Sequence, residues 1–217
     1  MTNQMVLAGL RKDYTLRALD LEGTAPDPFT QFGQWMDQAL EAAVPEPTAM
    51  HLGTVSADGR PAGRIVLLKG IDADGFTFFT NYNSRKGGHL AGSPYVSLTF
   101  FWPELERQVR VEGTVRKVSP EASDEYFRSR PRASRIGALA SPQSQVIPDR
   151  RVLEEKVAAL NAQYGEAADI ERPAHWGGYV VAPDAVEFWQ GRASRLHDRI
   201  LYTRTADGAW QKSRLAP

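Results

Sequence analysis

Hydrophobic residues three and four positions apart mark one amphipathic helix near the start of the chain. Asp27 followed by Pro28 has the form of an N-cap residue and a proline in the first helical turn. Pro45 and Pro47 then end the pattern, because proline lacks the N–H that a helix interior needs. A helix is therefore predicted over 28–43. Its apolar positions are Phe29, Phe32, Trp35, Met36, Leu40 and Ala43.

From 49 to 118 the apolar residues alternate with polar ones or cluster in short β-branched and aromatic runs, which is typical of strands. Asp-Gly pairs at 58–59 and 74–75 are turn signals between these runs. Ser84 is a typical N-cap residue, so a short helix is expected over 84–91. The predicted strands are 50–55, 63–69, 76–81, 95–102 and 108–118.

The second half of the chain mixes helices and strands. Ser119 and Pro120 repeat the cap-and-proline signature, which predicts a helix to about residue 128. A second amphipathic pattern predicts a helix over 149–164. The predicted closing strands are 176–181, 185–190, 199–204 and 210–215, with a turn at 206–208 between the last two.

Many short strands with few helices predict a mainly β fold, a mostly antiparallel barrel with peripheral helices. The regular strand–helix alternation of a doubly wound sheet is missing. Residues 1–26 are predicted to form an N-terminal arm, and residues 27–217 to form a single domain.

Composition narrows the function classes. The formal net charge is zero, which argues against a general nucleic-acid or membrane-surface role, because such roles need a standing positive field. The absence of cysteine excludes disulfides, thiolate nucleophiles and cysteine-based zinc sites. No apolar run approaches membrane-spanning length and no signal peptide is recognisable, so a cytoplasmic location is expected.

Familiar nucleotide and metal motifs are missing as well. No glycine-rich dinucleotide fingerprint follows a strand, and no P-loop sequence occurs. The four histidines have no ligand-like spacing, so no metal site is expected.

Basic residues gather in the stretch 190–199. Three arginines and His197 lie within eight residues there. If this stretch is a strand, Arg195 and His197 share one face, which Arg199 continues. Two guanidiniums and an imidazole beside Trp189 suit a planar, anionic ligand. The alternative is an exposed, charged edge strand.

Two further groups of residues suit phosphate. Arg85 and Lys86 follow a hydroxyl-rich strand end at an expected helix N-terminus, which favours an anion. Tyr126 and Arg130 are four residues apart and are expected on one helix face, with Ser134 in the next turn. The alternatives are a capped helix with solvated charges for the first group and a basic helix end for the second.

Two other segments carry weaker signals. Arg64 and Lys69 lie at the ends of an apolar run and are expected on opposite sides of a strand, with two rim charges as the alternative. Gln108 can hydrogen-bond the edge of a heterocycle, or it can simply lie on a solvent face.

The order and identity of these segments resemble the pyridoxine (pyridoxamine) 5′-phosphate oxidase family across nearly the whole chain. The matching stretches are RIVLLK (64–69), FFTNYNSRKGGHLA (78–91), WPELERQVRVEG (102–113), YFRSRPRASRIGALASPQS (126–144), HWGGYVV (175–181), VEFWQGRASRLHDR (186–199) and RLAP (214–217). The resemblance implies an FMN-binding split β-barrel that works as a homodimer, with FMN at the subunit interface.

The resemblance also implies roles for individual residues. It places FMN on Arg64, Ile65, Val66, Leu67, Leu68, Lys69, Phe79, Thr80, Arg85, Lys86, Gln108, Gln143, Ser144, Trp189 and Arg199. It places the substrate phosphate on Lys69, Tyr126, Arg130 and Ser134. It places Arg195, Leu196 and His197 at the substrate, with Arg195 and His197 as catalytic residues over the pyridine ring. The arm residues Arg11, Lys12, Asp13 and Tyr14 match a segment that can close over the substrate. Phe79 stands where the family commonly has tyrosine.

The implied reaction oxidises pyridoxine 5′-phosphate and pyridoxamine 5′-phosphate at C4′ to pyridoxal 5′-phosphate, in vitamin B6 biosynthesis and salvage. A hydride equivalent passes to the flavin, and O2 reoxidises FMN to give H2O2; the amine also yields ammonia. Two alternatives remain open. A non-catalytic flavin or B6 carrier would lack the substrate residues, and a nicotinamide-dependent flavin reductase would not need the second phosphate group.

Overall fold

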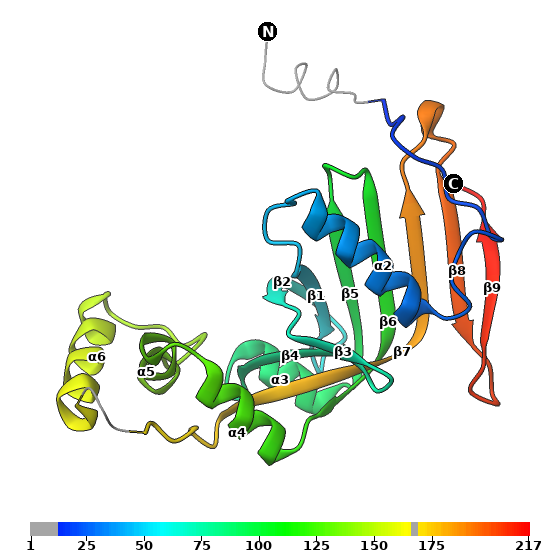
Figure 1. Cartoon of the computed structure of the whole chain (residues 1–217). Coiled ribbons are helices and arrows are strands. Elements are labelled where there is room, and N and C mark those ends of the chain that lie inside the picture. The colour runs from blue at the N-terminus through cyan, green and yellow to red at the C-terminus, as the bar shows by residue number, and fades with distance from the viewer. Residues whose placement is uncertain (1–12, 166–168) are drawn as a thin grey trace, which may run out of the picture. The chain divides into compact units, whose positions relative to one another are not determined.

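The computed structural model describes residues 13–165 and 169–217, which separate into two compact units. The first unit holds residues 13–47, 99–111 and 184–217, and the second holds the rest of the described chain. Figure 1 labels the helices and strands used below. Within the described ranges, no helix combines the length and the apolar character that crossing a membrane requires.

The first unit is built on helix α2, Pro28–Glu41 (Figure 1). The Asp27 carboxylate accepts hydrogen bonds from the N–H groups of Phe29 and Thr30, both at 2.9 Å, which confirms the predicted N-cap. Phe32 and Trp35 are buried, and their rings pack edge-on against Phe100 and Phe188. The helix ends at Glu41 rather than at 43 because Ala43 has a left-handed backbone, with φ 49°.

Strands at the C-terminal end of the chain also belong to this unit. The second half of β7 (Trp176–Gln190) pairs antiparallel with β8 (Asp198–Arg204), from Ala185↔Thr203 to Gln190↔Asp198. Strand β8 pairs in turn with β9, Trp210–Leu215, as predicted. The two strands expected over 176–181 and 185–190 form one continuous strand, which changes partner from β4 to β8 along its length.

The second unit contains two hairpins. Strand β1 (Ala49–Val55) pairs antiparallel with β2 (Pro61–Leu67), and β3 (Gly70–Asp72) pairs with β4 (Gly75–Asn81). Strand β4 also pairs with the first half of β7. The segment β3 is not expected from the sequence because its three residues are exposed and show no apolar alternation.

The hydrogen-bonded strand order is β2-β1-β5-β6-β7-β4-β3. Strands β5 (Tyr95–Trp102) and β6 (Arg107–Lys117), like β7, contribute residues to both units. The alternation predicted for β6 is present, since Val109, Val111 and Gly113 are buried. The mainly β architecture with peripheral helices agrees with the sequence pattern.

Four helices described in the second unit are α3 (Arg85–Gly92), α4 (Pro120–Ser129), α5 (Arg132–Ala140) and α6 (Arg151–Tyr164). Ser84 and Ser119 cap α3 and α4 as predicted. The sequence does not predict α5, because its N-cap position is Pro131 without a side-chain cap and only Ile136 and Ala140 of it are buried. Ile136 joins a small core with Phe127, Ile170 and Trp176.

Candidate active site

A pocket of about 470 Å³ in the second unit collects most of the predicted residues of that unit. Its walls come mainly from strands β2 and β4, from the start of α3 and from the α4–α5 turn. The lining residues are Ile65, Val66, Leu67, Lys69, Phe79, Thr80, Asn81, Lys86, Tyr126, Arg130, Pro131, Ser134, Gln143 and Trp176. Residues predicted separately for a cofactor and for a substrate phosphate therefore face one cavity.

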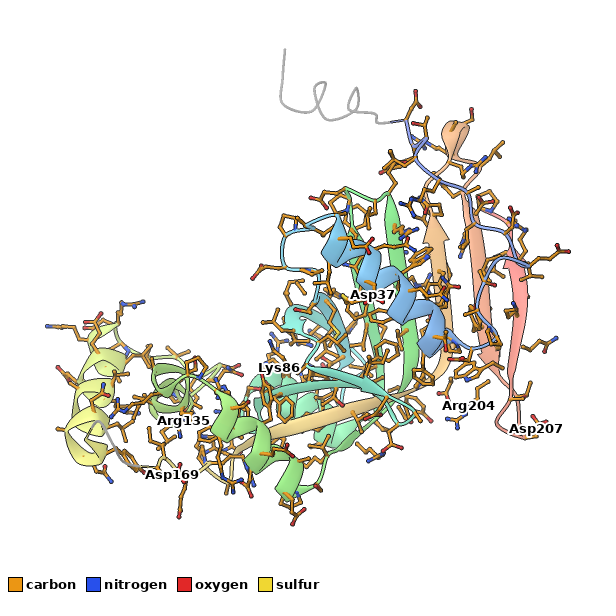
Figure 2. All side chains as sticks on the ribbon, in the orientation of Figure 1. Asp37, Lys86, Arg135, Asp169, Arg204 and Asp207 are labelled. Atoms are coloured by element: carbon orange, nitrogen blue, oxygen red, sulfur yellow. The ribbon has the colours of Figure 1, made fainter. Side chains whose placement is uncertain are left out.

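One part of this pocket is built around Lys86, at the start of α3 (Figure 2). Its Nζ donates to Gln143 Oε1 at 2.7 Å, to Thr80 Oγ1 at 3.1 Å and to Ser84 Oγ at 3.3 Å. Burial and the positive charge of Arg64 lower the pKa of Lys86. Neutral acceptors thus fix the position of the ammonium group, and none of these three contacts neutralises a positive charge on it.

Arg64 lies beside this group on β2. Its Nη1 donates to Thr54 Oγ1 at 2.6 Å and to the Leu52 carbonyl at 3.1 Å. Burial and the neighbouring Arg85 lower the pKa of Arg64. Within the described ranges, neither arginine nor Lys86 forms an ion pair with a carboxylate. Three cations that no described carboxylate neutralises, with Arg64 and Lys86 half-buried and Arg85 exposed, favour a bound anion such as phosphate.

Three nearly parallel aromatic rings form another wall of the pocket. Phe79 stacks on Tyr126 with ring centroids 3.9 Å apart, and Trp176 lies 6.2 Å from Tyr126 at an interplanar angle of 7°. The Arg130 guanidinium carbon lies 4.5 Å from the Trp176 ring centroid. Gly178 makes room for this wall, because a Cβ at that position would lie 2.7 Å from the Phe79 ring.

Arg130 carries an unused donor at this wall. Its Nη1 is buried and has no hydrogen-bond partner among the described residues. A buried, unpaired guanidinium nitrogen is costly, and an anionic ligand would satisfy it. Burial raises the pKa of Tyr126, so its hydroxyl stays protonated at neutral pH and can donate a hydrogen bond.

The structure corrects the predicted placement of this group. Arg130 is the C-cap residue of α4, with ψ 145°, so it does not share a helix face with Tyr126. Ser134 belongs to α5, which begins after Pro131. The chain turn between the two helices, rather than an i, i+4 spacing, brings the three side chains to one pocket.

The remaining predicted residues of this unit show different placements. Lys69 lines the pocket but lies beyond the end of β2, where its N–H donates to the Thr77 carbonyl at 2.8 Å. The Arg64 side chain, by contrast, is held by a hydrogen bond that its Nη1 donates to Thr54 on β1. Ser144 is exposed, with a left-handed backbone at φ 72°. Leu68 is buried.

In the first unit, Trp189 and His197 lie together, with ring centroids 4.5 Å apart. Tyr14 meets both rings edge-on, at 5.8 Å and 5.9 Å. His197 Nδ1 accepts a hydrogen bond from the Arg192 N–H at 3.1 Å. Burial and the charge of Arg195 lower the pKa of His197, which favours the neutral imidazole that can accept this bond.

The prediction that Arg195 and His197 share one face of a strand is wrong. Residues Ala193–Arg195 form a short 3-10 turn in which Ser194 and Arg195 have left-handed backbones, and β8 begins only at Asp198. The hydrogen bond from Arg192 to His197 closes this turn and replaces strand pairing. Leu196 is exposed, and Arg195 does not share a strand face with His197.

Arg199 and Gln108 also belong to the first unit. Arg199, on β8, is held by the buried carboxylate of Glu187 through Nε at 3.0 Å and Nη2 at 2.9 Å. Gln108 is half-buried on β6. Of the arm residues, Asp13 and Tyr14 are described, whereas Arg11 and Lys12 lie outside the described residues.

Three contributors have no role assigned from the sequence: Trp176, Thr54 and Glu187. The Trp-Gly-Gly run at 176–178 is the signal for the first, because two glycines beside a tryptophan allow close packing of rings. Nothing local in the sequence marks Thr54 or Glu187. Across 13–165 and 169–217, no cluster of three or more histidine or acidic side chains suits a metal ion.

Comparison with known proteins gives a consistent result. The family model described as pyridoxamine 5′-phosphate oxidase matches residues 36–164, and a model of the pyridoxine 5′-phosphate oxidase C-terminal dimerisation region matches residues 176–217. A curated relative named pyridoxine/pyridoxamine 5′-phosphate oxidase, from Paraburkholderia phymatum, is 58% identical over 97% of this chain and 99% of its own.

Solved structures support the fold. PhzG from Burkholderia lata, in complex with tetrahydrophenazine-1-carboxylic acid, has a TM-score of 0.87 and 29% identity, covering 93% of this chain and 99% of its own. A pyridoxamine 5′-phosphate oxidase-related, FMN-binding protein from Nostoc punctiforme has a TM-score of 0.71 at 20% identity, covering 89% of this chain and 100% of its own. These likenesses confirm the predicted split-barrel fold. With two family models covering most of its length and a relative more than half identical, the chain belongs to the pyridoxine/pyridoxamine 5′-phosphate oxidase family of oxidoreductases.

Proposed function

We propose that this protein oxidises pyridoxine 5′-phosphate and pyridoxamine 5′-phosphate to pyridoxal 5′-phosphate in the vitamin B6 metabolism of the cytoplasm. FMN is the cofactor, O2 is the electron acceptor, and the products are H2O2 and, from the amine, ammonia. The observation that carries the proposal is that two separate sets of anion donors line the same pocket. One set is Lys86, and the other is the Tyr126–Arg130–Ser134 group.

The residues present fit FMN. Lys86 is already oriented by Gln143, Thr80 and Ser84, and it stands near two arginines without a compensating carboxylate among the described residues. These cations would hold the FMN phosphate, and the backbone of 65–68 would follow the flavin. FMN, when bound, supplies the acceptor for the two electrons and the proton equivalent that leave C4′ of the substrate.

The second set of donors would hold the substrate phosphate. Arg130 offers its unpaired Nη1, Tyr126 offers a protonated hydroxyl, and Lys69 and Ser134 complete the set. Trp176 supports the Arg130 guanidinium from one side. Holding the phosphate at several points would orient the pyridine ring and lower the entropic cost of reaching the reactive geometry.

Arg195 and His197 are proposed to act at the pyridine ring. Because Nδ1 accepts from the Arg192 N–H, a neutral His197 carries its proton on Nε2 and can donate a hydrogen bond to a ring substituent without adding charge. The exposed Arg195 supplies the positive charge. Arg195→Leu should therefore lower kcat more than it weakens FMN binding. Loss of FMN from this variant would instead assign Arg195 to the cofactor.

The dimerisation region matched at 176–217 supports a homodimer, and the proposed FMN position is the subunit interface. The relative that is 58% identical carries the oxidase name, whereas the PhzG structure, bound to a tetrahydrophenazine acid, is 29% identical. The oxidase is therefore preferred over a phenazine-related activity, over a flavin carrier and over a nicotinamide-dependent reductase.

A visible spectrum of the purified protein, followed by aerobic addition of pyridoxine 5′-phosphate, tests the proposal. Bound flavin, with formation of both pyridoxal 5′-phosphate and H2O2, is the expected result. Bound flavin without turnover would favour a carrier, and consumption of NADH in proportion to flavin reduction would favour a reductase. Failure to bind added FMN would overturn the proposal.

A further inference from the structure

We propose that Glu187 is a positioning residue for the cofactor: its buried carboxylate orients the Arg199 guanidinium toward FMN, together with the main-chain carbonyl of Ala216. This inference rests on the proposed function, in which Arg199 contacts the flavin. All three residues belong to the first unit.

The register of the sheet brings Glu187 and Arg199 together. Trp189 lies opposite Arg199 and Glu187 lies opposite Leu201 on neighbouring antiparallel strands. Glu187 and Arg199 are therefore diagonal neighbours on one face of the sheet. The Glu187 side chain is 7% exposed, and its two oxygens receive the Nε and Nη2 donors of Arg199 at 3.0 Å and 2.9 Å. This two-point geometry fixes the plane of the guanidinium.

A third contact holds the other side of the same group. Arg199 Nη1 donates to the Ala216 carbonyl at 2.7 Å. The pairing Arg199↔Leu215 between β8 and β9 places the last residues of the chain beside the guanidinium. The closing Arg-Leu-Ala-Pro sequence thereby contributes a backbone acceptor at a defined position.

Counting donors shows what is left for a ligand. An arginine has five N–H bonds, and these three contacts use one on each nitrogen. Two N–H bonds remain, one on Nη1 and one on Nη2, and no described residue accepts them. The arrangement leaves a guanidinium with a fixed plane and two donors at its outer end, which suits the carbonyl or phosphate oxygens of a planar anionic cofactor.

The Glu187 carboxylate lies close to two arginines. Arg199 and, at 3.5 Å, Arg110 Nη1 both approach its carboxylate. The hydrogen bond to Glu187 raises the pKa of Arg199. Two guanidinium groups therefore face the Glu187 carboxylate, and Arg199 is the one that it holds at two points.

The test measures FMN affinity of the full-length protein by quenching of flavin fluorescence when apoprotein is titrated. Glu187→Gln keeps the size of the side chain but removes the charge and one acceptor, and it should weaken FMN binding about 10-fold, as expected for one charge-assisted hydrogen bond. Glu187→Asp keeps the charge but withdraws it by one methylene, and it should give a smaller loss. This second variant keeps the test usable if Glu187→Gln folds poorly.

Two further variants separate positioning from general stability. In an Arg199→Ala background, Glu187→Gln should change FMN affinity by less than about 2-fold, because the group it orients is gone. The matched control is Asp198→Asn, which breaks other ion pairs of β8, those with Arg214 at 2.8 Å and with Arg192 at 3.7 Å. Asp198→Asn should lower the melting temperature and leave FMN affinity unchanged within about 2-fold.

The outcomes are distinct. If Arg199→Ala weakens FMN but Glu187→Gln does not, the inference is wrong and the flavin role of Arg199 stands. If neither variant weakens FMN binding while the parent protein binds FMN and turns over substrate, Arg199 is not a flavin ligand. The inference is then wrong, although the proposed function stands. If the parent protein does not bind FMN, both fall.

Discussion

At the scale of single residues, the candidate site is defined by cationic side chains that no carboxylate among the described residues neutralises and, at Arg130, by a donor without a protein partner. Arg130 keeps a buried Nη1 unsatisfied, and Lys86 is surrounded by neutral acceptors only. A folded protein tolerates such groups where a ligand supplies the missing acceptor or the compensating negative charge. The most direct predictions therefore concern what happens when these donors are removed.

Arg130→Ala should raise KM for both phosphorylated substrates by about 10- to 150-fold, the range expected when one charge-assisted phosphate contact of about 1.5–3 kcal/mol is lost. FMN affinity should stay unchanged, because the FMN phosphate is proposed to lie on Lys86 and Arg64. Steady-state kinetics with pyridoxine 5′-phosphate measure the effect. Arg128→Ala, an exposed arginine in the last turn of α4, is the control and should leave KM unchanged. An unaltered KM in Arg130→Ala would remove this residue from the phosphate site.

His197 gives a prediction about pH. Its pKa in the folded protein lies below the ordinary value of 6.5, through burial and the charge of Arg195. Below pH 6.5 the unfolded chain therefore takes up a proton that the folded chain refuses, and acidification favours unfolding until the folded pKa is passed. His197→Asn, which keeps an acceptor for the Arg192 N–H, should show a smaller loss of stability on acidification.

Urea denaturation of the parent protein and of His197→Asn at about pH 7.5 and about pH 5.5 measures this difference, since the interval spans the ordinary histidine pKa. The same denaturation of His51→Asn, which changes an exposed histidine, is the control. Equal acid sensitivity of the parent and His197→Asn would show that this imidazole is not held in its neutral form.

At the scale of elements, close packing constrains the wall of the pocket more than the helix or strand propensity of its residues does. Gly178 in β7 is an example, because a methyl group there would meet Val118 Cγ2 at 2.6 Å and the Phe79 ring at 2.7 Å. The ring cannot move without disturbing Tyr126, which stacks on it. The glycine thus links a strand to the wall of the pocket.

Gly178→Ala should destabilise the protein by about 1–3 kcal/mol, as overpacking of a close-packed site does, and should raise KM for the phosphate substrates by displacing the aromatic wall. Gly88→Ala in α3 is the matched control. Nothing lies within 4 Å of a Cβ at Gly88, so the substitution should be neutral or stabilising by up to about 1 kcal/mol. Thermal unfolding compares the stabilities of the two variants, and steady-state kinetics compare their KM values. Equal stability of the two variants would contradict the packing argument.

Much of the element pattern is predictable because it is local. The strands at 95–102 and 210–215 match residue for residue, and Asp27, Ser84 and Ser119 act as the expected caps. Where tertiary contacts decide, the sequence pattern fails. Examples are β3, whose three residues are exposed, and α5, whose N-cap position is Pro131 without a side-chain cap. The stretch 193–197 fails for a local reason, because a turn closed by His197 takes the place of a strand.

The candidate site divides in the same way. Residue types predict two groups of phosphate donors, and the family resemblance implies their assignment to cofactor and substrate. The i, i+4 spacing expected for the second group is wrong, because Arg130 is the C-cap residue of α4. The contacts that orient these donors are long-range in sequence, and no local signal marks them. Thr54 beside Arg64, Trp176 beside Arg130 and Glu187 beside Arg199 all come from other strands of the sheet.

At the scale of the whole molecule, the cofactor and the oligomeric state are expected to be linked. If FMN binds at the interface of a homodimer, it binds the dimer and not the separated chains, so FMN must strengthen association by mass action. In the second unit, the large apolar side chains of Ile65, Leu67 and Tyr95 are exposed on strands, as expected of a surface that another copy covers.

Sedimentation equilibrium of the apoprotein should therefore show a mass approaching twice 24.1 kDa, with dissociation at low concentration that added FMN suppresses. Lys86→Ala is the informative variant, because it removes a proposed phosphate contact without altering an exposed apolar side chain. Its dimer should dissociate like that of the parent apoprotein, but a given concentration of FMN should stabilise it less. If FMN left the dissociation of the parent dimer unchanged, the flavin would bind within each chain independently, and the interface position would be wrong even if the oxidase activity were confirmed.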